Sequence, residues 1–230
     1  MTVYRILAVD DDWAILRALW RGLRLEGFAV DTVDTGPLAL DRVDKAPPDA
    51  IVLDVSMPGM PGVEVCARLR ASGTRVPVLL LSGRDEVDHR AAGLAAGADD
   101  CVLKPFDLYE LALRLRALLR HVAPYTGAAS RATVRAGPLA LDPAARRVTL
   151  HGREVEVTRR AFDLLEVLAR NAGIPMSRAL LLERVWGYDF AVDAGPLDTL
   201  VGYLRRKLEA DGGPRLLHTV RGSGFMLREP

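Results

Sequence analysis

Ala50-Ile51-Val52-Leu53-Asp54 is an apolar run that stops abruptly at an acid. Other short apolar segments have the composition of strands, at residues 5–9, 28–33, 76–81 and 100–103. Segments with apolar residues at helical spacing follow the five strands, at residues 13–25, 37–45, 63–71, 86–96 and 107–120. Five strand–helix alternations with nearly continuous apolar strands predict a parallel sheet that carries helices on both faces.

The length and charge of the chain indicate two domains. The 230 residues are half hydrophobic and 27% charged, which is typical of globular domains with real cores. Residues 1–121 carry 15 basic and 18 acidic side chains, whereas residues 122–230 carry 16 and 12. An acidic front half and a basic rear half favour an anionic partner for the rear.

Several classes of protein are excluded by what the sequence lacks. No apolar run is long enough for a transmembrane helix, and the acids at residues 10–12 stand where a signal peptide needs its apolar core. Cys66 and Cys101 form no CxxC pair and fit a reducing cytoplasm, so we expect a cytoplasmic protein. The four histidines have no metal-ligand spacing, and neither a phosphate-binding loop nor a GxSxG elbow is present.

Polar residues stand where the predicted strands end. Asp10 and Asp11 follow the first strand, Asp54 ends the third, Ser82 the fourth and Lys104 the fifth. Ligands of open parallel sheets bind beyond the carboxyl ends of the strands, so these groups should converge. Clustered carboxylates require a cation, and hard oxygen ligands suit Mg²⁺. A metal, a lysine and a hydroxyl beside a free carboxylate predict phosphoryl transfer with Asp54 as the nucleophile.

The alternative reading of such acids is helix capping. A single acid after a strand is commonly the N-cap of the next helix, and Asp12 is assigned that role. Capping does not explain polar residues at the ends of four strands in order. The functional interpretation is therefore favoured for the set.

Residues 1–121 resemble the receiver domain of two-component response regulators. The motifs that carry the resemblance are Val9-Asp10-Asp11, Leu53-Asp54 with Met57-Pro58, Leu81-Ser82-Gly83 and Lys104-Pro105-Phe106. The resemblance implies a flavodoxin-like fold in which a sensor histidine kinase phosphorylates Asp54. It also implies direct Mg²⁺ ligation by Asp11, Asp54 and the Ser56 backbone carbonyl, with Asp10 ligating through water. Lys104 would pair with the phosphoryl oxygens, and Ser82 would follow them by a hydrogen bond.

Two positions depart from the receiver pattern. Pro61 replaces the usual Asp of the Met-Pro-x-x-Asp-Gly loop, and it suits the first turn of the next helix. Cys101 stands where the family usually has an aromatic residue that reorients with the Ser or Thr. A small apolar side chain cannot perform that switch, so Ser82 and the neighbouring helix must carry it or the coupling is weaker. Cys101 itself is expected to be a buried, inert thiol.

The end of this half resembles the OmpR/PhoB subfamily, in which the fourth helix, fifth strand and fifth helix form a two-fold dimer face after phosphorylation. Charges of both signs on one surface suit a patch that must complement itself. The alternative is an ordinary solvated face. The charged positions that match are Arg90, Asp99, Asp100, Glu110, Arg114 and Arg120.

Residues 122–133 are small and polar and predict a linker to a second domain at residues 134–230. Strand signals lie near residues 138–141, 146–150 and 153–157. Helices are expected after Thr158, from Ser177 to Trp186 and from Pro196 to Leu208. The chain closes with a hairpin around a Gly-rich turn, and three helices followed by a hairpin predict a winged helix.

The third of these helices would enter the major groove of DNA, and Arg221 in the hairpin turn the minor groove. Phe162-Asp163-Leu164-Leu165, Val185-Trp186-Gly187 and Thr219-Val220-Arg221-Gly222 resemble the OmpR/PhoB effector domain. The opening of the third helix, at residues 194–199, lacks the usual basic residues, so fewer phosphate contacts are expected. The expected DNA-binding residues are Trp186, Tyr203, Arg205, Arg206, Lys207, Thr219 and Arg221, with a place in the core as the equal alternative for Trp186.

These expectations describe a transcription regulator that a sensor histidine kinase phosphorylates, that forms a homodimer and that binds promoter DNA, with RNA polymerase as a candidate partner. It would be no enzyme beyond its own Mg²⁺-dependent phosphorylation and dephosphorylation. A haloacid dehalogenase-type phosphatase would need a second Asp two residues after the nucleophile, where Ser56 stands. A phosphorylation-independent regulator with a constitutively dimeric receiver remains the alternative, because of Cys101.

Overall fold

The computed structural model describes residues 3–83, 87–120, 132–190 and 192–229. The chain divides into two compact units, residues 1–123 and 124–230, each with its own core. Most of the predicted linker, residues 122–133, lies outside the described residues. None of the described helices has the length and apolar character needed to cross a membrane.

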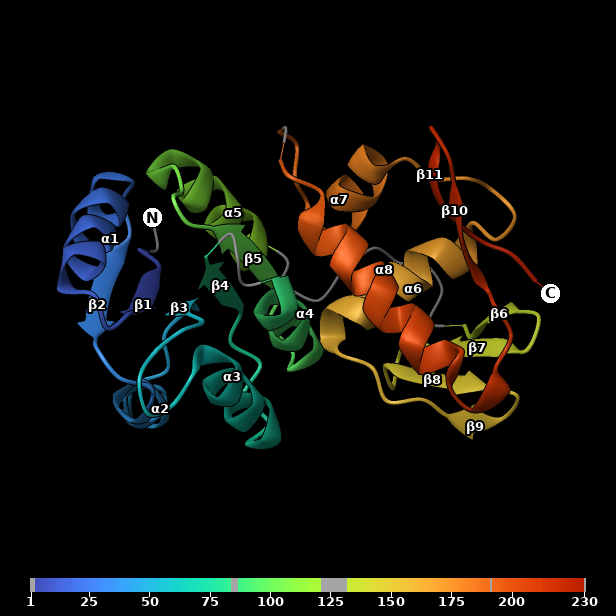
Figure 1. Ribbon diagram of the computed structural model, residues 1–230, viewed down its shortest axis with the longest axis horizontal. Coiled ribbons are helices and arrows are strands. Elements are labelled where there is room, and N and C mark those ends of the chain that lie inside the picture. The colour runs from blue at the N-terminus through green and yellow to red at the C-terminus, as the bar shows by residue number, and fades with distance from the viewer. Residues whose placement is uncertain (1–2, 84–86, 121–131, 191, 230) are drawn as a thin grey trace. The chain divides into compact units, whose positions relative to one another are not determined.

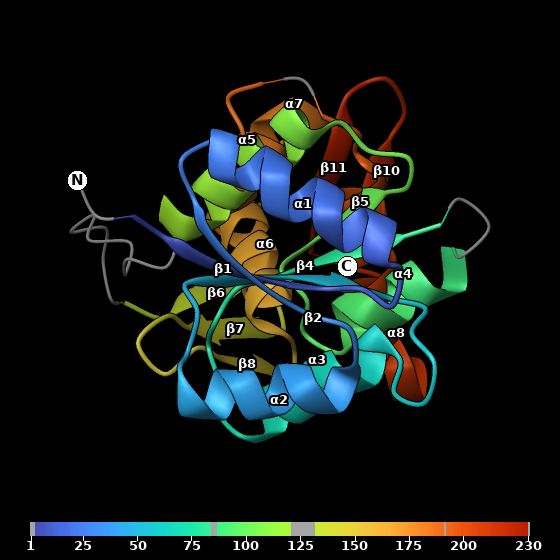
Figure 2. The ribbon, with the colours of Figure 1, turned by 90° about the vertical axis from the view of Figure 1, so that its left-hand side faces the viewer.

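The first unit is built on a five-stranded parallel sheet with the order β2-β1-β3-β4-β5 (Figures 1 and 2). This order and the helices on both faces make the fold flavodoxin-like, as predicted. Figure 2 shows α1 and α5 on one face and α2 and α3 on the other. The strands are β1 Arg5–Val9, β2 Ala29–Val33, β3 Ala50–Asp54, β4 Val78–Ser82 and β5 Asp100–Leu103. The helices are α1 Trp13–Leu25, α2 Gly36–Lys45, α3 Gly62–Ala71, α4 Val87–Ala95 and α5 Leu108–Arg120.

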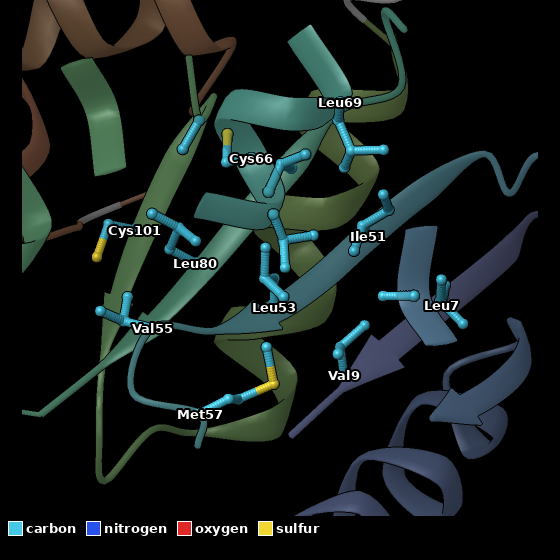
Figure 3. Close-up of a cluster of buried hydrophobic side chains, with 14 of the residues drawn as sticks. Leu7, Val9, Ile51, Leu53, Val55, Met57, Cys66, Leu69, Leu80 and Cys101 are labelled. Carbon is cyan, nitrogen blue, oxygen red and sulfur yellow. The ribbon is translucent and has the colours of Figure 1, made fainter. Parts of the chain in front are cut away.

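The core of this unit explains why its strands are nearly all apolar. β3 and β4 are buried on both faces along their whole length. On one face, alternate residues such as Leu53 and Leu80 pack with Cys66 and Leu69 of α3 (Figure 3). The packed strands hold their carboxyl ends at one edge, where the predicted polar residues stand.

Both cysteines lie in this core rather than at a reactive surface. Cys66 has no exposed surface and Cys101 is 5% exposed, and both belong to the cluster of Figure 3. Burial raises the pKa of the Cys66 thiol to about 12. A thiol that stays protonated is a poor nucleophile, so Cys66 is an inert core residue.

The second unit is a winged helix, as predicted. An antiparallel sheet of order β6-β7-β8-β9 precedes three helices and the β10–β11 hairpin (Figure 1). Thr158 and Ser177 cap α6 and α7 by accepting hydrogen bonds from Ala161 and Leu180 amides. The strands are β6 Val134–Ala136, β7 Leu139–Asp142, β8 Arg147–Leu150, β9 Arg153–Glu154, β10 Leu217–Val220 and β11 Gly224–Leu227. The helices are α6 Arg159–Arg170, α7 Arg178–Trp186, α8 Gly195–Leu208 and the 3₁₀ helix η1 Ala210–Gly212.

Two details of this sheet differ from the sequence expectation. β6 was not predicted, because three residues are too few to display an alternating pattern. β9 has two residues instead of the five expected. After the Val155 amide bonds the Val148 carbonyl, the chain leaves the sheet to reach the cap of α6 at Thr158.

Candidate functional site

Three acids meet at the carboxyl edge of the first unit's sheet, as predicted. β1 and β3 are neighbours, so Asp10 after β1 lies beside Asp54 at the end of β3. With Asp11, they offer carboxylate oxygens that all lie within 4.8 Å of one another. Asp10 and Asp54 are 1% and 4% exposed, whereas Asp11 is exposed. Two buried carboxylates and one at the surface form an acidic cluster.

Lys104 supplies the positive charge beside this acidic cluster. Its Nζ lies 2.7 Å from Asp10 Oδ2 and 2.6 Å from Asp54 Oδ1. The Lys104 amide donates to the Ser82 carbonyl at 2.7 Å, which ties the end of β5 to β4. Sheet pairing thus brings a lysine more than 90 positions along the chain from Asp10 to the acids.

Backbone amides fix the other oxygen of each buried acid. The Ser56 amide donates to Asp54 Oδ2 at 3.0 Å, and the Asp12 amide donates to Asp10 Oδ1 at 2.9 Å. Each carboxylate is therefore held by an amide on one oxygen and by Lys104 on the other. Asp12 itself caps α1 by accepting from the Ala14 amide at 2.7 Å, which confirms its predicted role.

The electrostatics of the acidic cluster favour a further cation. Burial raises the pKa of Asp54, although Lys104 and the Ser56 amide oppose that change. The neighbouring carboxylates raise the pKa of Lys104 against its own burial, so the ammonium stays charged. One ammonium thus faces a cluster of three acids, and the ionised form of Asp54 is not fully compensated. Clustered hard oxygen donors of this kind fit Mg²⁺.

Ser82 lies at the end of β4 with no exposed surface, and its hydroxyl donates to the Gly83 carbonyl at 3.2 Å. Gly62 is a site residue that the strand-end argument missed. A Cβ at Gly62 would lie 2.0 Å from the Asp54 carbonyl oxygen, so only glycine permits this approach of α3 to β3. The Gly that ends the loop motif at residues 57–62 was the available signal.

The raised pKa of Asp54 gives a stability prediction. We expect Asp54→Asn to raise the thermal midpoint of the receiver unit by about 3–5 °C at pH 7.5 when a chelator removes divalent cations. The ionised acid destabilises the fold, so the gain grows as pH rises through the raised pKa and vanishes below its ordinary value near 4. Calorimetry across pH checks this, with exposed Asp44→Asn as the control. A lower midpoint at pH 7.5 would contradict it.

On the second unit, the predicted DNA-binding residues separate into exposed and buried groups. Arg206 and Lys207 are exposed on α8, and Arg221 is exposed at the turn of the β10–β11 hairpin. Trp186 has no exposed surface, and Tyr203 is 7% exposed. Trp186 is therefore the core residue that the sequence offered as the alternative to a DNA contact. Tyr203 likewise packs inward, with its hydroxyl bonded by the Thr158 amide.

Arg205 and Thr219, also expected at DNA, bind each other. Arg205 Nη2 donates to Thr219 Oγ1 at 2.9 Å, and Arg205 Nε donates to the Leu217 carbonyl at 3.1 Å. Burial lowers the pKa of Arg205. The arginine therefore connects α8 to the hairpin in this structure.

The predicted dimer face is only partly a free charged surface. Arg114 is 2% exposed and pairs with Asp100 at 3.0 Å and with Glu110 at 2.7 Å. Asp99 is also 2% exposed, and its Oδ2 accepts from Arg70. Asp99, Asp100 and Arg114 thus form ion pairs within the receiver, and their place in a dimer face stays a prediction.

The remaining positions of that face keep exposed surface. Arg120 at the end of α5 is exposed, and Arg90 and Glu110 are partly exposed. The exposed surface at these three positions is compatible with the predicted dimer face, which stays a prediction.

Comparisons with known proteins agree with both units. A family model of the response regulator receiver domain matches residues 6–116, and one of the C-terminal part of transcriptional regulatory proteins matches residues 152–227. The transcriptional regulatory protein PrrA of Mycobacterium tuberculosis is 54% identical over 228 residues, 99% of this chain and 97% of PrrA. The response regulator MprA of Mycolicibacterium vanbaalenii is 49% identical over 225 residues, 98% and 97% of the two chains.

Solved structures lead to the same family. The response regulator DrrB of Thermotoga maritima, an OmpR/PhoB homologue, has a TM-score of 0.51 and 29% identity over 99% of this chain and all of DrrB. A response regulator from Chloroflexus aurantiacus has a TM-score of 0.50 and 35% identity over 52% of this chain and 99% of its own. The chain therefore belongs to the two-component response regulators of the OmpR/PhoB type, with a receiver domain followed by a winged-helix DNA-binding domain.

Proposed function

We propose that Asp54 of the receiver accepts a phosphoryl group from a sensor histidine kinase and that this controls promoter binding by the effector domain. The observation that carries the proposal is the pair of buried carboxylates, Asp10 and Asp54, bridged by the ammonium of Lys104. A structural ion pair needs one acid. A second buried acid beside it has a cost that a metal-dependent phosphoryl site explains.

Asp11, Asp54 and the Ser56 carbonyl would hold Mg²⁺ directly, and Asp10 would hold it through water. The donor set fits because the three acids offer hard oxygens within 4.8 Å of one another. When bound, the metal would neutralise charge on the phosphoryl oxygens. Asp54 is deprotonated when it attacks, so the site carries excess negative charge that the metal would help to offset.

The chain's own part in the transfer is positioning. A carboxylate oxygen of Asp54 forms a bond to phosphorus while the phosphorus–nitrogen bond of a phosphohistidine breaks and the imidazole leaves. Lys104 moves from the carboxylates to the incoming phosphoryl oxygens, because it lies between both acids and carries a flexible stem. The Ser82 hydroxyl then leaves the Gly83 carbonyl for the new phosphoryl group, which repacks the adjoining loop. Hydrolysis of the acyl phosphate by water restores Asp54.

The output would be a homodimer on DNA. The receiver would pair through α4, β5 and α5, using Arg90, Glu110 and Arg120, with residues 122–133 as the linker. Arg206 and Lys207 on α8 would contact the major groove and its phosphates, and Arg221 the minor groove. Their exposure supports this assignment. Promoter DNA and RNA polymerase would be the partners of the effector domain.

The experiment that tests this function compares the full chain with and without Mg²⁺ and acetyl phosphate. Sedimentation gives the oligomeric state, and fluorescence anisotropy gives affinity for a DNA duplex that carries the promoter region of its own operon. We expect the donor to shift the wild type to a dimer and to raise its affinity about tenfold or more, with no response from Asp54→Asn. A response of Asp54→Asn equal to that of the wild type would contradict the proposal.

A phosphorylation-independent regulator is the second candidate, and Cys101 is the observation that favours it. The thiol is 5% exposed within the hydrophobic cluster, so no aromatic ring links the Ser82 region to the surface at this position. A stable dimer without the donor, together with equal DNA binding by wild type and Asp54→Asn, would select this reading.

A further inference from the structure

Arg205 binds the β10–β11 hairpin through two hydrogen bonds. Nε donates to the Leu217 carbonyl at 3.1 Å and Nη2 donates to the Thr219 hydroxyl at 2.9 Å. Both acceptors belong to β10, while Arg205 belongs to the last turn of α8. The guanidinium thus spans from the end of the recognition helix to the strand that leads into the turn at Arg221.

A second arginine holds the start of the same helix. Arg178 of α7 pairs with Asp198 in the first turn of α8, with Nη2 2.8 Å from Oδ1 and Nε 3.3 Å from Oδ2. The Arg178 guanidinium carbon also lies 4.6 Å from the centre of the Phe225 ring of β11. Arg178 therefore connects α7, the opening of α8 and the hairpin.

The two arginines act on one rung of the hairpin. Thr219 and Phe225 are directly opposite partners in the β10–β11 register. Arg205 binds Thr219 from one end of α8, and Arg178 stacks on Phe225 beside the other end. We infer that Arg178 and Arg205 are positioning residues that set the spacing between the exposed cations of α8 and Arg221 at the hairpin turn. This inference rests on the DNA-binding face proposed above.

The chemistry of Arg205 favours positioning over a phosphate contact. Its Nε and Nη2, two of the three guanidinium nitrogens, donate to the Leu217 carbonyl and the Thr219 hydroxyl. A phosphate that drew the guanidinium away would leave the part-buried Leu217 carbonyl without this donor. Arg206, the next residue, is exposed and has no ion pair or side-chain hydrogen bond among the described residues. Adjacent arginines thus have different tasks: one holds the hairpin and the other faces solvent.

The first test measures how affinity depends on salt. The full chain binds a mixed-sequence DNA duplex in a titration from about 50 to 200 mM salt, with Arg206→Ala as the matched control. We expect Arg206→Ala to flatten the slope of log affinity against log salt by about 0.9, the value for one lost phosphate contact. Arg205→Ala should lower affinity about fivefold to tenfold and change the slope no more than Thr219→Val, which breaks the same hydrogen bond without removing a charge. A flatter slope in Arg205→Ala than in Thr219→Val would overturn the inference.

The second test couples Arg205 to the hairpin turn. We expect Arg221→Ala to lower affinity about tenfold in the wild type but less than about twofold in Arg205→Ala, because the turn is then no longer held against DNA. Thr219→Val removes the acceptor without changing charge and should give the same coupling. Thr219→Val also keeps the coupling measurable if Arg205→Ala fails to fold. Additive effects in both pairs would overturn the inference.

The same titrations separate this inference from the DNA-binding proposal. If the wild type shows no salt-dependent binding, the face itself is wrong and the inference falls with it. If the wild type and Arg206→Ala behave as expected while Arg205→Ala flattens the slope more than Thr219→Val does, DNA binding stands and only the positioning role is overturned.

Discussion

Lys104→Ala will lower the rate at which Asp54 gains a phosphoryl group by about 100-fold. The ammonium is the only positive charge that contacts the carboxylates among the described residues, at 2.7 Å from Asp10 and 2.6 Å from Asp54. Without it, charge on the transferring group loses a preorganised partner, and such a loss typically costs two to three orders of magnitude. Phosphoryl uptake from acetyl phosphate in Mg²⁺, followed over time by intact mass, measures the rate.

Lys45→Ala is the matched control, because Lys45 is an exposed lysine of α2 whose one ion pair among the described residues is with Asp41. Its rate should equal that of the wild type. Lys104→Arg keeps the charge but spreads it over a planar group, and it should recover only part of the rate. A Lys104→Ala rate within about threefold of the wild type would remove Lys104 from the transfer.

The Arg70–Asp99 pair is expected to make a large contribution to receiver stability. Arg70 donates to the carbonyls of Gly97, Thr74 and Val76 and to Asp99, whose Oδ2 also accepts from the Val78 amide at 3.0 Å. Arg70→Ala removes the arginine that pairs with a carboxylate only 2% exposed. We expect a loss of about 3 kcal/mol in the free energy of unfolding, near the low end for a broken buried pair.

Arg68→Ala is the control on the same helix. Arg68 is exposed and forms one pair with Glu64 at i,i+4, so its removal should cost less than about 0.5 kcal/mol. Denaturant unfolding of the full chain, followed by circular dichroism, compares the variants. Equal losses for the two would show that the Arg70 network does not hold the loops around β4 and β5.

The receiver site could be predicted because polar residues that directly follow apolar runs mark the ends of strands. Asp10, Asp54 and Lys104 each follow an apolar run, and a parallel sheet must bring such ends to one edge. The sheet order then sets which ends are neighbours, and β1 beside β3 brings the two acids together. The helices of the winged domain were similarly marked by their caps, Thr158 and Ser177.

Tertiary partners were beyond the reach of sequence patterns. An arginine such as Arg114 is normally expected at the surface, yet it is buried against Asp100. Asp100 lies on β5, and the sequence pattern of α5 does not reveal this contact. Trp186 ends an amphipathic helix, where periodicity leaves its direction open, and its ring lies in the core. Arg205 looks like its neighbour Arg206 in a basic run, and only the position of β10 separates their roles.

The central claim is that Asp54 is the phosphoryl acceptor, and intact mass tests it most directly. The full chain and Asp54→Asn are incubated side by side with Mg²⁺ and acetyl phosphate, next to a receiver known to respond. We predict a gain of one phosphoryl group in the wild type alone, lost again when Mg²⁺ is chelated before the donor is added. No gain in the wild type while the control receiver is labelled, or an equal gain in Asp54→Asn, would contradict the account.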